Sequence, residues 1–169
     1  MSTHHVLVTC PAGKERRAFI EVLDCILPYD SSAHVEISNT FRGVLLLKTA
    51  LNSMEAARIL FKCPTSVICR VVPLVKFVPS KVEDVVEAAK ELLANSPKFS
   101  SFAVKCIRRG RAFSSSAALS SLLGKVIAEA FNMKVDLTNP EVFLWIEVLG
   151  GHTGLSLLTP GQIYRKRCR

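Results

Sequence analysis

The chain has 169 residues, of which 49% are hydrophobic, and a formal net charge of +8. This hydrophobic content excludes a disordered tail and predicts one or two folded domains. The positive charge favours nucleic acid or another anionic surface as a partner, although charge alone does not choose between them. No apolar run is long enough to span a bilayer, and Met1 to Cys10 lacks a basic start followed by an apolar core. We therefore expect a cytoplasmic protein with no membrane partner.

The first part of the chain alternates strand and helix patterns. In order, they predict a strand at His5–Thr9, a helix at Gly13–Leu27, strands at His34–Ser38 and Val44–Thr49, a short helix capped by Ser53, and a strand at Val67–Val72. This β-α-β-β-α-β order is the split unit of a ferredoxin-like fold, with two helices on one face of an antiparallel sheet. Lys14 follows a glycine, but the second glycine and the Ser/Thr of a P-loop are missing.

A segment bounded by prolines follows, from Pro73 to Pro79. Proline interrupts a strand ladder, so this segment is predicted to be an extended connector. The predicted domains are residues 1–75 and 76–169.

The second part predicts a helix, a strand, a longer helix and a hairpin. These elements lie at Lys81–Asn95, at Phe102–Ile107, from Ser114–Ser116 to Phe131, and at Glu141–Leu149 with Gly154–Thr159. A right-handed crossover would make the strands Phe102–Ile107 and Glu141–Leu149 parallel. The apolar pattern of Glu141–Leu149 on both faces predicts a strand buried on both sides, with Trp145 in the core.

A basic segment joins the first of these strands to the longer helix. It contains four cations with no acid among them, Lys105, Arg108, Arg109 and Arg111, followed by Ser114, Ser115 and Ser116. Free N–H groups at a helix start, the positive end of its dipole and guanidinium groups together suit a phosphate. Two alternatives stay open: the cations are solubilising charges in a solvated loop, or the arginines are structural and pair with Asp136 or Glu147.

The six cysteines contain no CxxC pair, and most lie in apolar patterns. They are Cys10, Cys25, Cys63, Cys69, Cys106 and Cys168. Zinc ligation is not expected, and we predict no metal and no cofactor. Buried thiols acting as small hydrophobes are the favoured interpretation, with an occasional disulfide as the alternative if the source is a hyperthermophile. No histidine has an acid or nucleophile pattern nearby, so no catalytic residue is predicted.

The second half resembles a known RNA-binding module. The segments SFAVKCIRRGRAFSSSAALSSLLGKVIAEAF, KVDLTNP and EVFLWIEV occur in the order typical of a THUMP domain, over roughly Lys81 to Arg167. The front half, with LVTCPAGKE and FRGVLLLKT, is similar to the ferredoxin-like domain that accompanies THUMP. The expected fold class is therefore α/β (α+β), a ferredoxin-like βαββαβ domain followed by a THUMP α/β domain.

Together the halves resemble the stand-alone THUMP proteins that assist tRNA cytidine N4-acetylation. The resemblance implies a tRNA-binding adaptor that grips the acceptor stem and 3′ end and presents tRNA to a separate RNA cytidine acetyltransferase. We expect an adaptor and not an enzyme, because no Gly-rich cofactor loop, SGGxDS loop or HxE…PCxxC signature is present. The alternatives are a tRNA-binding subunit of another RNA-modification enzyme, and a metabolite-binding regulator or small enzyme of the ferredoxin-like class.

The resemblance also assigns RNA-binding residues. The family's basic strand-to-helix segment falls on Lys105, Arg108, Arg109, Arg111 and Ser114–Ser116, with an expected role in phosphate contact. Further candidates are Lys125 on the polar side of the helix, Arg42 in the first hairpin turn, and Arg165, Lys166 and Arg167 in the basic tail. The alternative for the tail is a frayed, solvated end. Phe113 is a candidate for base stacking, but a core role is favoured.

Overall fold

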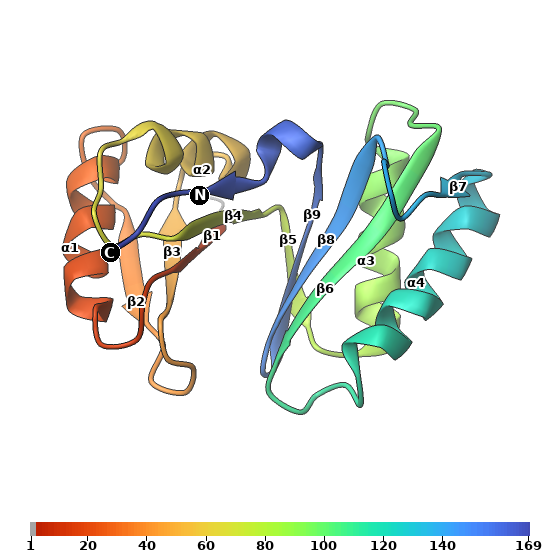
Figure 1. Ribbon diagram of the computed structural model, residues 1–169, viewed down its shortest axis with the longest axis horizontal. Helices are drawn as coiled ribbons and strands as arrows, with labels where there is room; N and C mark the ends of the chain where they lie inside the picture. The colour runs from red at the N-terminus through yellow and green to blue at the C-terminus, as the bar shows by residue number, and fades with distance from the viewer. Residues whose placement is uncertain (1–2) are drawn as a thin grey trace. The chain divides into compact units, whose positions relative to one another are not determined.

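The computed structural model describes residues 3–169. Within them the chain divides into two compact units. The first unit runs to Val75 and also includes Ile163–Arg169, and the second unit is Lys76–Gln162. Each unit holds its own five-stranded sheet of described strands, coloured along the chain in Figure 1.

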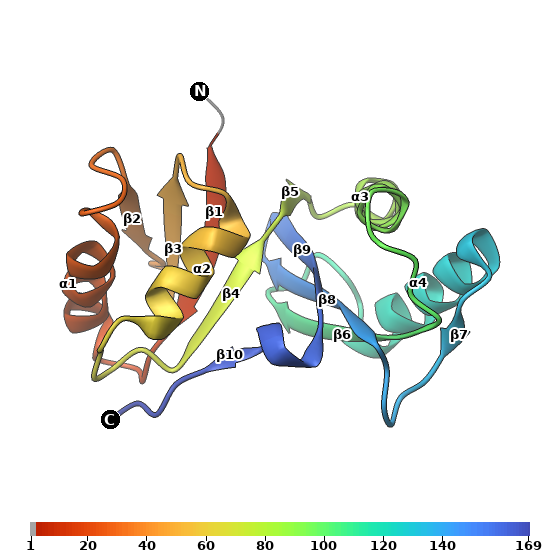
Figure 2. The same ribbon diagram turned by 90° about the horizontal axis from the view of Figure 1, so that it is seen from above.

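The first unit contains the predicted βαββαβ order and one further strand. Its elements are β1 (His4–Thr9), α1 (Glu15–Ile26), β2 (His34–Ile37), β3 (Val44–Thr49), α2 (Ser53–Lys62), β4 (Arg70–Leu74) and β10 (Tyr164–Arg165). The strand order is β10-β4-β1-β3-β2, and every neighbouring pair is antiparallel. Helices α1 and α2 lie on one face of this sheet (Figure 2). The predicted ferredoxin-like arrangement is confirmed.

The core of the first unit follows from strand alternation. Val6 and Val8 of β1 lie opposite Leu47 and Leu45 of β3, and all four side chains are buried. They pack with Val22 and Ile26 of α1 and with Ala57 and Leu60 of α2. Apolar residues at alternate strand positions therefore supply the face that the helices cover.

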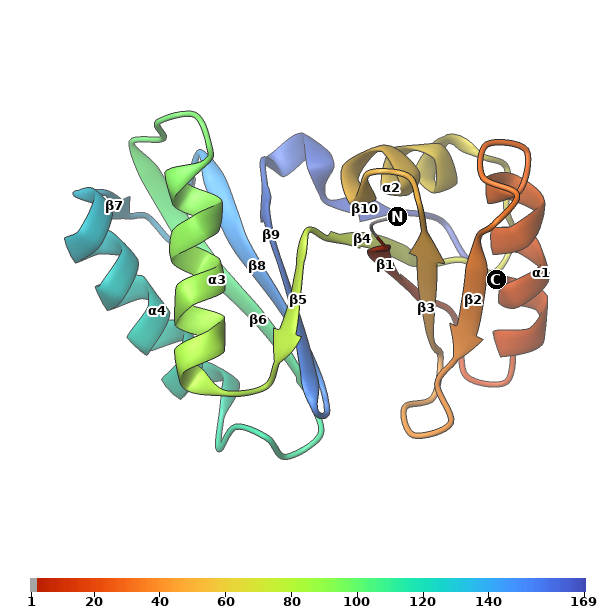
Figure 3. The ribbon, with the colours of Figure 1, turned by 180° about the vertical axis from the view of Figure 1, so that it is seen from behind.

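The second unit contains a sheet with two helices on one face. Its elements are β5 (Lys76–Pro79), α3 (Val82–Ala94), β6 (Ser101–Arg109), α4 (Ser116–Phe131), β7 (Lys134–Val135), β8 (Val142–Leu149), β9 (His152–Leu158) and the short 3₁₀ helix η1 (Pro160–Gln162). The strand order is β5-β9-β8-β6-β7. Strands β6 and β8 are parallel, as the crossover predicted, and β8 and β9 form the predicted hairpin. Figure 3 shows α3 and α4 side by side against this sheet.

The segment predicted as a connector is largely strand. Strand β4 continues through Pro73, which lies opposite Val6, and β5 begins at Lys76. The expectation that proline would interrupt the ladder was wrong at Pro73. Strand β10 pairs with β4 at Arg70 and Val71, so Pro73 lies beyond the paired stretch of that edge, where a missing N–H is tolerated.

The C-terminal residues return to the first unit. Residues 163–169, predicted as the end of the second domain, are grouped with the first, because β10 pairs antiparallel with β4. The predicted division after residue 75 coincides with the division between the units. The alternative of a frayed tail is contradicted by this pairing.

Four of the described cysteines form disulfides, Cys25–Cys63 and Cys69–Cys168. The favoured interpretation of buried free thiols was wrong for these residues. The partners are 38 and 99 residues apart in sequence, so spacing alone does not reveal that the fold brings them together. Cys10 and Cys106 are free, and burial raises the pKa of each thiol to about 11, which fits the expected role of small hydrophobes.

Across residues 3–169, no helix combines the length and apolar character needed to cross a bilayer.

Candidate functional site

The basic segment begins inside a strand. Strand β6 has nine residues and continues to Arg109, two residues beyond the predicted end at Ile107. Three of the four cations are therefore strand residues, and strand alternation directs their side chains to different faces. Lys105 and Arg109 share one face, whereas Arg108 lies on the face that the helices cover. The prediction of one basic loop was wrong in this respect.

Arg109 is engaged in a buried ion pair. Its Nη1 donates to Oε1 of Glu147 at 2.7 Å, with 18% of the Arg109 side chain and none of the Glu147 side chain exposed. Trp145 Nε1 donates to Oε2 of the same carboxylate, also at 2.7 Å. A buried carboxylate requires such donors, because its desolvation is otherwise very costly. The alternative that an arginine pairs with Glu147 is confirmed for Arg109, and the core position predicted for Trp145 is confirmed.

Arg108 holds the loop that follows β6. Its Nη1 donates to the carbonyl oxygen of Phe113 at 2.9 Å and lies 3.4 Å from that of Gly110. Gly110 has a φ of +93°, which favours glycine, and it starts the turn that brings Phe113 back onto the helix-side core. Phe113 is buried, so its predicted core role is confirmed. The Arg108 side chain remains exposed, with further N–H donors available to a ligand.

The start of α4 is capped as the serine run predicted. Ser115 is the N-cap, and its Oγ accepts a hydrogen bond from the Ala118 N–H at 2.9 Å. The hydroxyl of Ser115 is thus used inside the protein. Ser114 is exposed just before it, and the N–H groups of Ser116 and Ala117 lie in the first turn, where a helix offers no acceptor of its own. The positive end of the helix dipole adds to the attraction for an anion there.

Two further cations are exposed, one before α4 and one within it. Arg111 lies in the loop, and Lys125 lies on α4 in line with Ala117 and Ser121 at intervals of four residues. Gly124, the residue before Lys125, is buried. The exposed candidates of the second unit are therefore Lys105, Arg108, Arg111, Ser114 and Lys125.

The first unit carries the remaining predicted candidates. Arg42 is exposed in the turn between β2 and β3. That turn is fixed by Glu15, whose carboxylate accepts from the N–H of Gly43 at 3.0 Å and of Gly13 at 2.6 Å. The hydrogen bond from Gly43 is the main cause that lowers the pKa of Glu15. A Cβ at Gly43 would lie 2.4 Å from the carbonyl oxygen of Cys10, so only glycine fits beside Arg42.

The cations of the basic tail are exposed or partly buried. Arg165 and Arg167 are exposed. Lys166 instead directs its Nζ to the carbonyl oxygens of Leu60 at 2.8 Å and Cys63 at 2.5 Å, at the end of α2. Burial lowers the pKa of the Lys166 amine. The geometry therefore gives Lys166 an internal role, and its predicted contact with RNA finds no support in its position.

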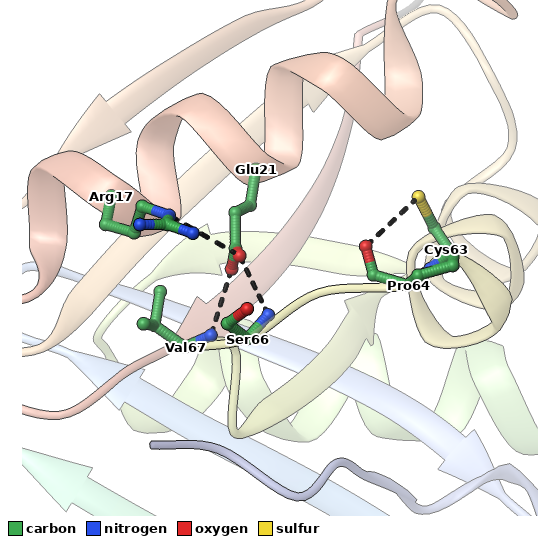
Figure 4. A network of polar contacts seen from close by, with 6 residues as sticks. All are labelled: Arg17, Glu21, Cys63, Pro64, Ser66 and Val67. Carbon is green, nitrogen blue, oxygen red and sulfur yellow. Dashed lines mark hydrogen bonds and ion pairs between the residues drawn. The ribbon is translucent and has the colours of Figure 1, made fainter.

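A separate pocket of about 410 Å³ lies in the first unit between α1 and the end of α2. On its wall, Glu21 accepts from the N–H groups of Ser66 at 2.8 Å and Val67 at 3.0 Å, and Arg17 lies 3.8 Å away (Figure 4). These contacts fasten a loop to α1. No group of three potential metal-ligating side chains occurs within residues 3–169.

Comparison with known families identifies the second unit. Residues 79–158 match the model of the THUMP domain, which covers β5 to β9 almost completely. The chain therefore carries a THUMP domain, a domain associated with tRNA binding in RNA-modification enzymes. A comparison with curated protein sequences gives no match.

Several solved structures have a similar fold. PH1313 from Pyrococcus horikoshii Ot3 is 19% identical with a TM-score of 0.73, over 92% of this chain and 54% of that one. TrmN from Thermus thermophilus is 20% identical with a TM-score of 0.61, over 92% and 45%. A 4-thiouridine synthetase in complex with RNA and ATP is 19% identical with a TM-score of 0.65, over 93% and 41%. This chain thus spans about half of each solved chain, and the likeness shows the fold.

Proposed function

We propose that this protein is a tRNA-binding adaptor that presents tRNA to a separate modification enzyme. The observation that carries the proposal is the THUMP domain at residues 79–158, with exposed cations beside the open first turn of α4. The RNA bound by the 4-thiouridine synthetase with the same fold supports the choice of ligand class.

The contacts in the second unit suit the phosphate backbone. Arg108 and Arg111 are exposed guanidinium donors in the segment that leads into α4, the first turn of α4 contains the N–H groups of Ser116 and Ala117, and Lys125 is an exposed cation further along the helix. Guanidinium and amide N–H groups are donors that bind phosphate oxygens. Contacts of this kind position an RNA without reading its sequence. An adaptor needs this property if it serves several tRNAs.

The finer assignments rest on the sequence resemblance. The acceptor stem and the single-stranded 3′ end are the proposed RNA elements, and an RNA cytidine acetyltransferase is the proposed enzyme. In this proposal the chain supplies binding and the partner supplies the acetyl-transfer chemistry.

The test is a salt titration of tRNA affinity for intact tRNA and for tRNA lacking its 3′ single strand. We expect weaker binding to the trimmed tRNA. Replacing Arg108, Arg111 and Lys125 with Ala should lower the salt slope by roughly 2 to 3 units, since each lost phosphate contact removes about 0.7 to 0.9. Lys90→Ala is the matched control, because Lys90 is exposed on α3 among acidic residues.

Four outcomes would each contradict one part of the proposal. Equal affinity for intact and trimmed tRNA would show that the protein does not bind the 3′ end. An unchanged salt slope in the triple variant places the RNA surface elsewhere. If the purified protein forms acetylcytidine on tRNA with acetyl-CoA and ATP and without a partner, it is an enzyme and not an adaptor. If it co-purifies with a different RNA-modification enzyme, the tRNA-binding role stands and the proposed acetyltransferase partner is wrong.

A further inference from the structure

The last six residues alternate between buried and exposed side chains. Tyr164, Lys166 and Cys168 are partly buried, whereas Arg165, Arg167 and Arg169 are exposed. Alternation of this kind is the signature of extended chain with one covered face. We call the three exposed residues the arginine row.

Backbone hydrogen bonds connect the tail to β4 and to the residues just before it. Tyr164 and Arg165 lie opposite Val71 and Arg70. Beyond β10 two more backbone hydrogen bonds join the tail to the same segment, from the Lys166 N–H to the Cys69 carbonyl at 2.7 Å and from the Arg169 N–H to that of Ser66 at 2.9 Å. The arginine row therefore lies in a tail whose backbone is hydrogen-bonded to the protein on both sides of Arg167.

The covered face of the tail is anchored by three different contacts. The Tyr164 ring stacks on Phe61 of α2 at a centroid distance of 4.6 Å. Lys166 Nζ binds the carbonyl groups at the end of α2. Cys168 is joined to Cys69 by a disulfide. Each anchored residue is a direct neighbour in sequence of one or two of the arginines. The contacts of the covered side chains therefore also restrict where the backbone of the exposed arginines lies.

The charges of the row are not neutralised within the described residues. No carboxylate of residues 3–169 lies within ion-pair distance of Arg165, Arg167 or Arg169. Alternate residues of an extended strand are about 6.6 to 6.8 Å apart. This separation is similar to that of successive phosphates along a nucleic acid strand, so neighbouring arginines can each reach a different phosphate.

We propose that the arginine row is a second RNA-binding surface, which contacts consecutive backbone phosphates, and that the Cys69–Cys168 disulfide fixes it in place. This inference rests on the proposed function for the ligand, and it adds Arg169 and a redox dependence. A dithiol that reduces the disulfide supplies two electrons and two protons and is itself oxidised to a disulfide, leaving Cys69 and Cys168 as thiols. Arg167 and Arg169, next to Cys168, then lose their covalent anchor.

The first test removes the charges. We expect the variant Arg165→Ala/Arg167→Ala/Arg169→Ala to bind tRNA more weakly and to have a salt slope lower by about 2 to 3 units. Arg58→Ala is the matched control, because Arg58 is an exposed arginine of the same unit that is already paired with Glu55. A thermal melt of each variant shows whether the fold is intact.

The second test separates the two disulfides. Cys69→Ser/Cys168→Ser should lower the salt slope by about 1 to 2 units, whereas Cys25→Ser/Cys63→Ser should leave it unchanged. Dithiothreitol should have the same effect on wild type and on the Cys25/Cys63 variant, and none on the Cys69/Cys168 variant. In the triple arginine variant, loss of the Cys69–Cys168 disulfide should cause no additional change in affinity, because the disulfide is proposed to act only through the contact between the arginine row and RNA.

The outcomes distinguish this inference from the proposed function. If wild type binds tRNA in a salt-sensitive manner but the triple arginine variant binds equally well, the arginine row is not an RNA-binding surface and the proposed function stands. If the cysteine variant weakens binding equally with and without the arginines, the disulfide does not act through the row. A wild type with no affinity for tRNA overturns both.

Discussion

At the scale of single residues, two arginines of one basic segment have different environments. Arg109 is mostly buried and neutralises Glu147, which is fully buried. Arg111 is exposed in the following loop. Removing Arg109 leaves a buried carboxylate with fewer donors, whereas removing Arg111 takes one charge from the surface. Stability and RNA affinity should therefore respond to different arginines.

We predict that Arg109→Ala lowers the free energy of unfolding by about 3 kcal/mol, because the buried Glu147 carboxylate loses its ion pair with the Arg109 guanidinium. Arg111→Ala should change it by less than about 0.5 kcal/mol and weaken tRNA binding instead. Urea unfolding beside tRNA titration measures both effects. An Arg109→Ala protein of wild-type stability would contradict the structural role of the Arg109–Glu147 pair.

The residue scale also shows what sequence can reveal. The serine run predicted the capped start of α4 correctly, since capping depends on residues three positions apart. The partner of Arg109 lies 38 residues away and becomes a neighbour only through the parallel pairing of β6 and β8. From the sequence, Glu147 was therefore one of two possible partners for a structural arginine. Arg169 was not among the predicted RNA-binding residues, because a terminal cation carries no local pattern.

At the scale of elements, Asp30 joins the end of α1 to the end of β3. One carboxylate oxygen accepts from the Oγ and N–H of Ser32, and the other accepts from Thr49 Oγ1 at 2.6 Å and the Ala50 N–H at 2.9 Å. The hydroxyl of Ser32, followed by that of Thr49, is the main cause that holds the pKa of Asp30 well below its usual range. The ionised form is thus favoured in the folded state.

This lowered pKa predicts how stability depends on pH. The ionised Asp30 carboxylate contributes fully to the free energy of unfolding above the unfolded-state pKa of about 4. This contribution is lost as the pH falls through the lower folded-state pKa. Asp30→Asn should therefore be less stable than wild type at neutral pH, and the difference should shrink as the pH falls below 4. Urea unfolding from acid to neutral pH measures it, with Asp24→Asn on the exposed side of α1 as the control. A constant difference across this range would contradict the prediction.

Elements were predictable where hydrophobic periodicity was strong. The helices and strands of both units were anticipated in order, and the parallel pairing of β6 with β8 followed from the handedness of crossovers. The missed strands, β5, β7 and β10, have four or two residues each. Their existence depends on pairing with a distant neighbour, which leaves little trace in a short stretch of sequence.

At the scale of the whole molecule, the connectivity is that of an insertion. Residues 76–162 form the second unit and are entered from β4 of the first unit and left towards β10 of the same unit. The Cys69–Cys168 disulfide closes a covalent ring around this insertion, because its two cysteines flank the second unit in sequence. A single peptide-bond cleavage within residues 76–162 therefore gives two fragments that this disulfide still joins.

A protease test follows from this ring. With a recognition sequence inserted after Arg111, the cleaved wild-type protein should migrate as one species on a denaturing gel without reductant and as two fragments with reductant. Cys69→Ser/Cys168→Ser should give two fragments in both conditions, whereas Cys25→Ser/Cys63→Ser should behave as wild type. Two fragments from cleaved, non-reduced wild type would show that the disulfide is absent in solution.

The position of Trp145 gives each unit its own optical probe. It is the one tryptophan in the sequence and lies in the second unit, whereas both tyrosines, Tyr29 and Tyr164, lie in the first. Fluorescence excited selectively at tryptophan therefore follows the surroundings of the Glu147 carboxylate, to which the indole N–H donates. If the tryptophan signal and the far-ultraviolet circular dichroism change at the same denaturant concentration, the inserted unit and its host unfold together, and separate midpoints would make them independent cooperative units.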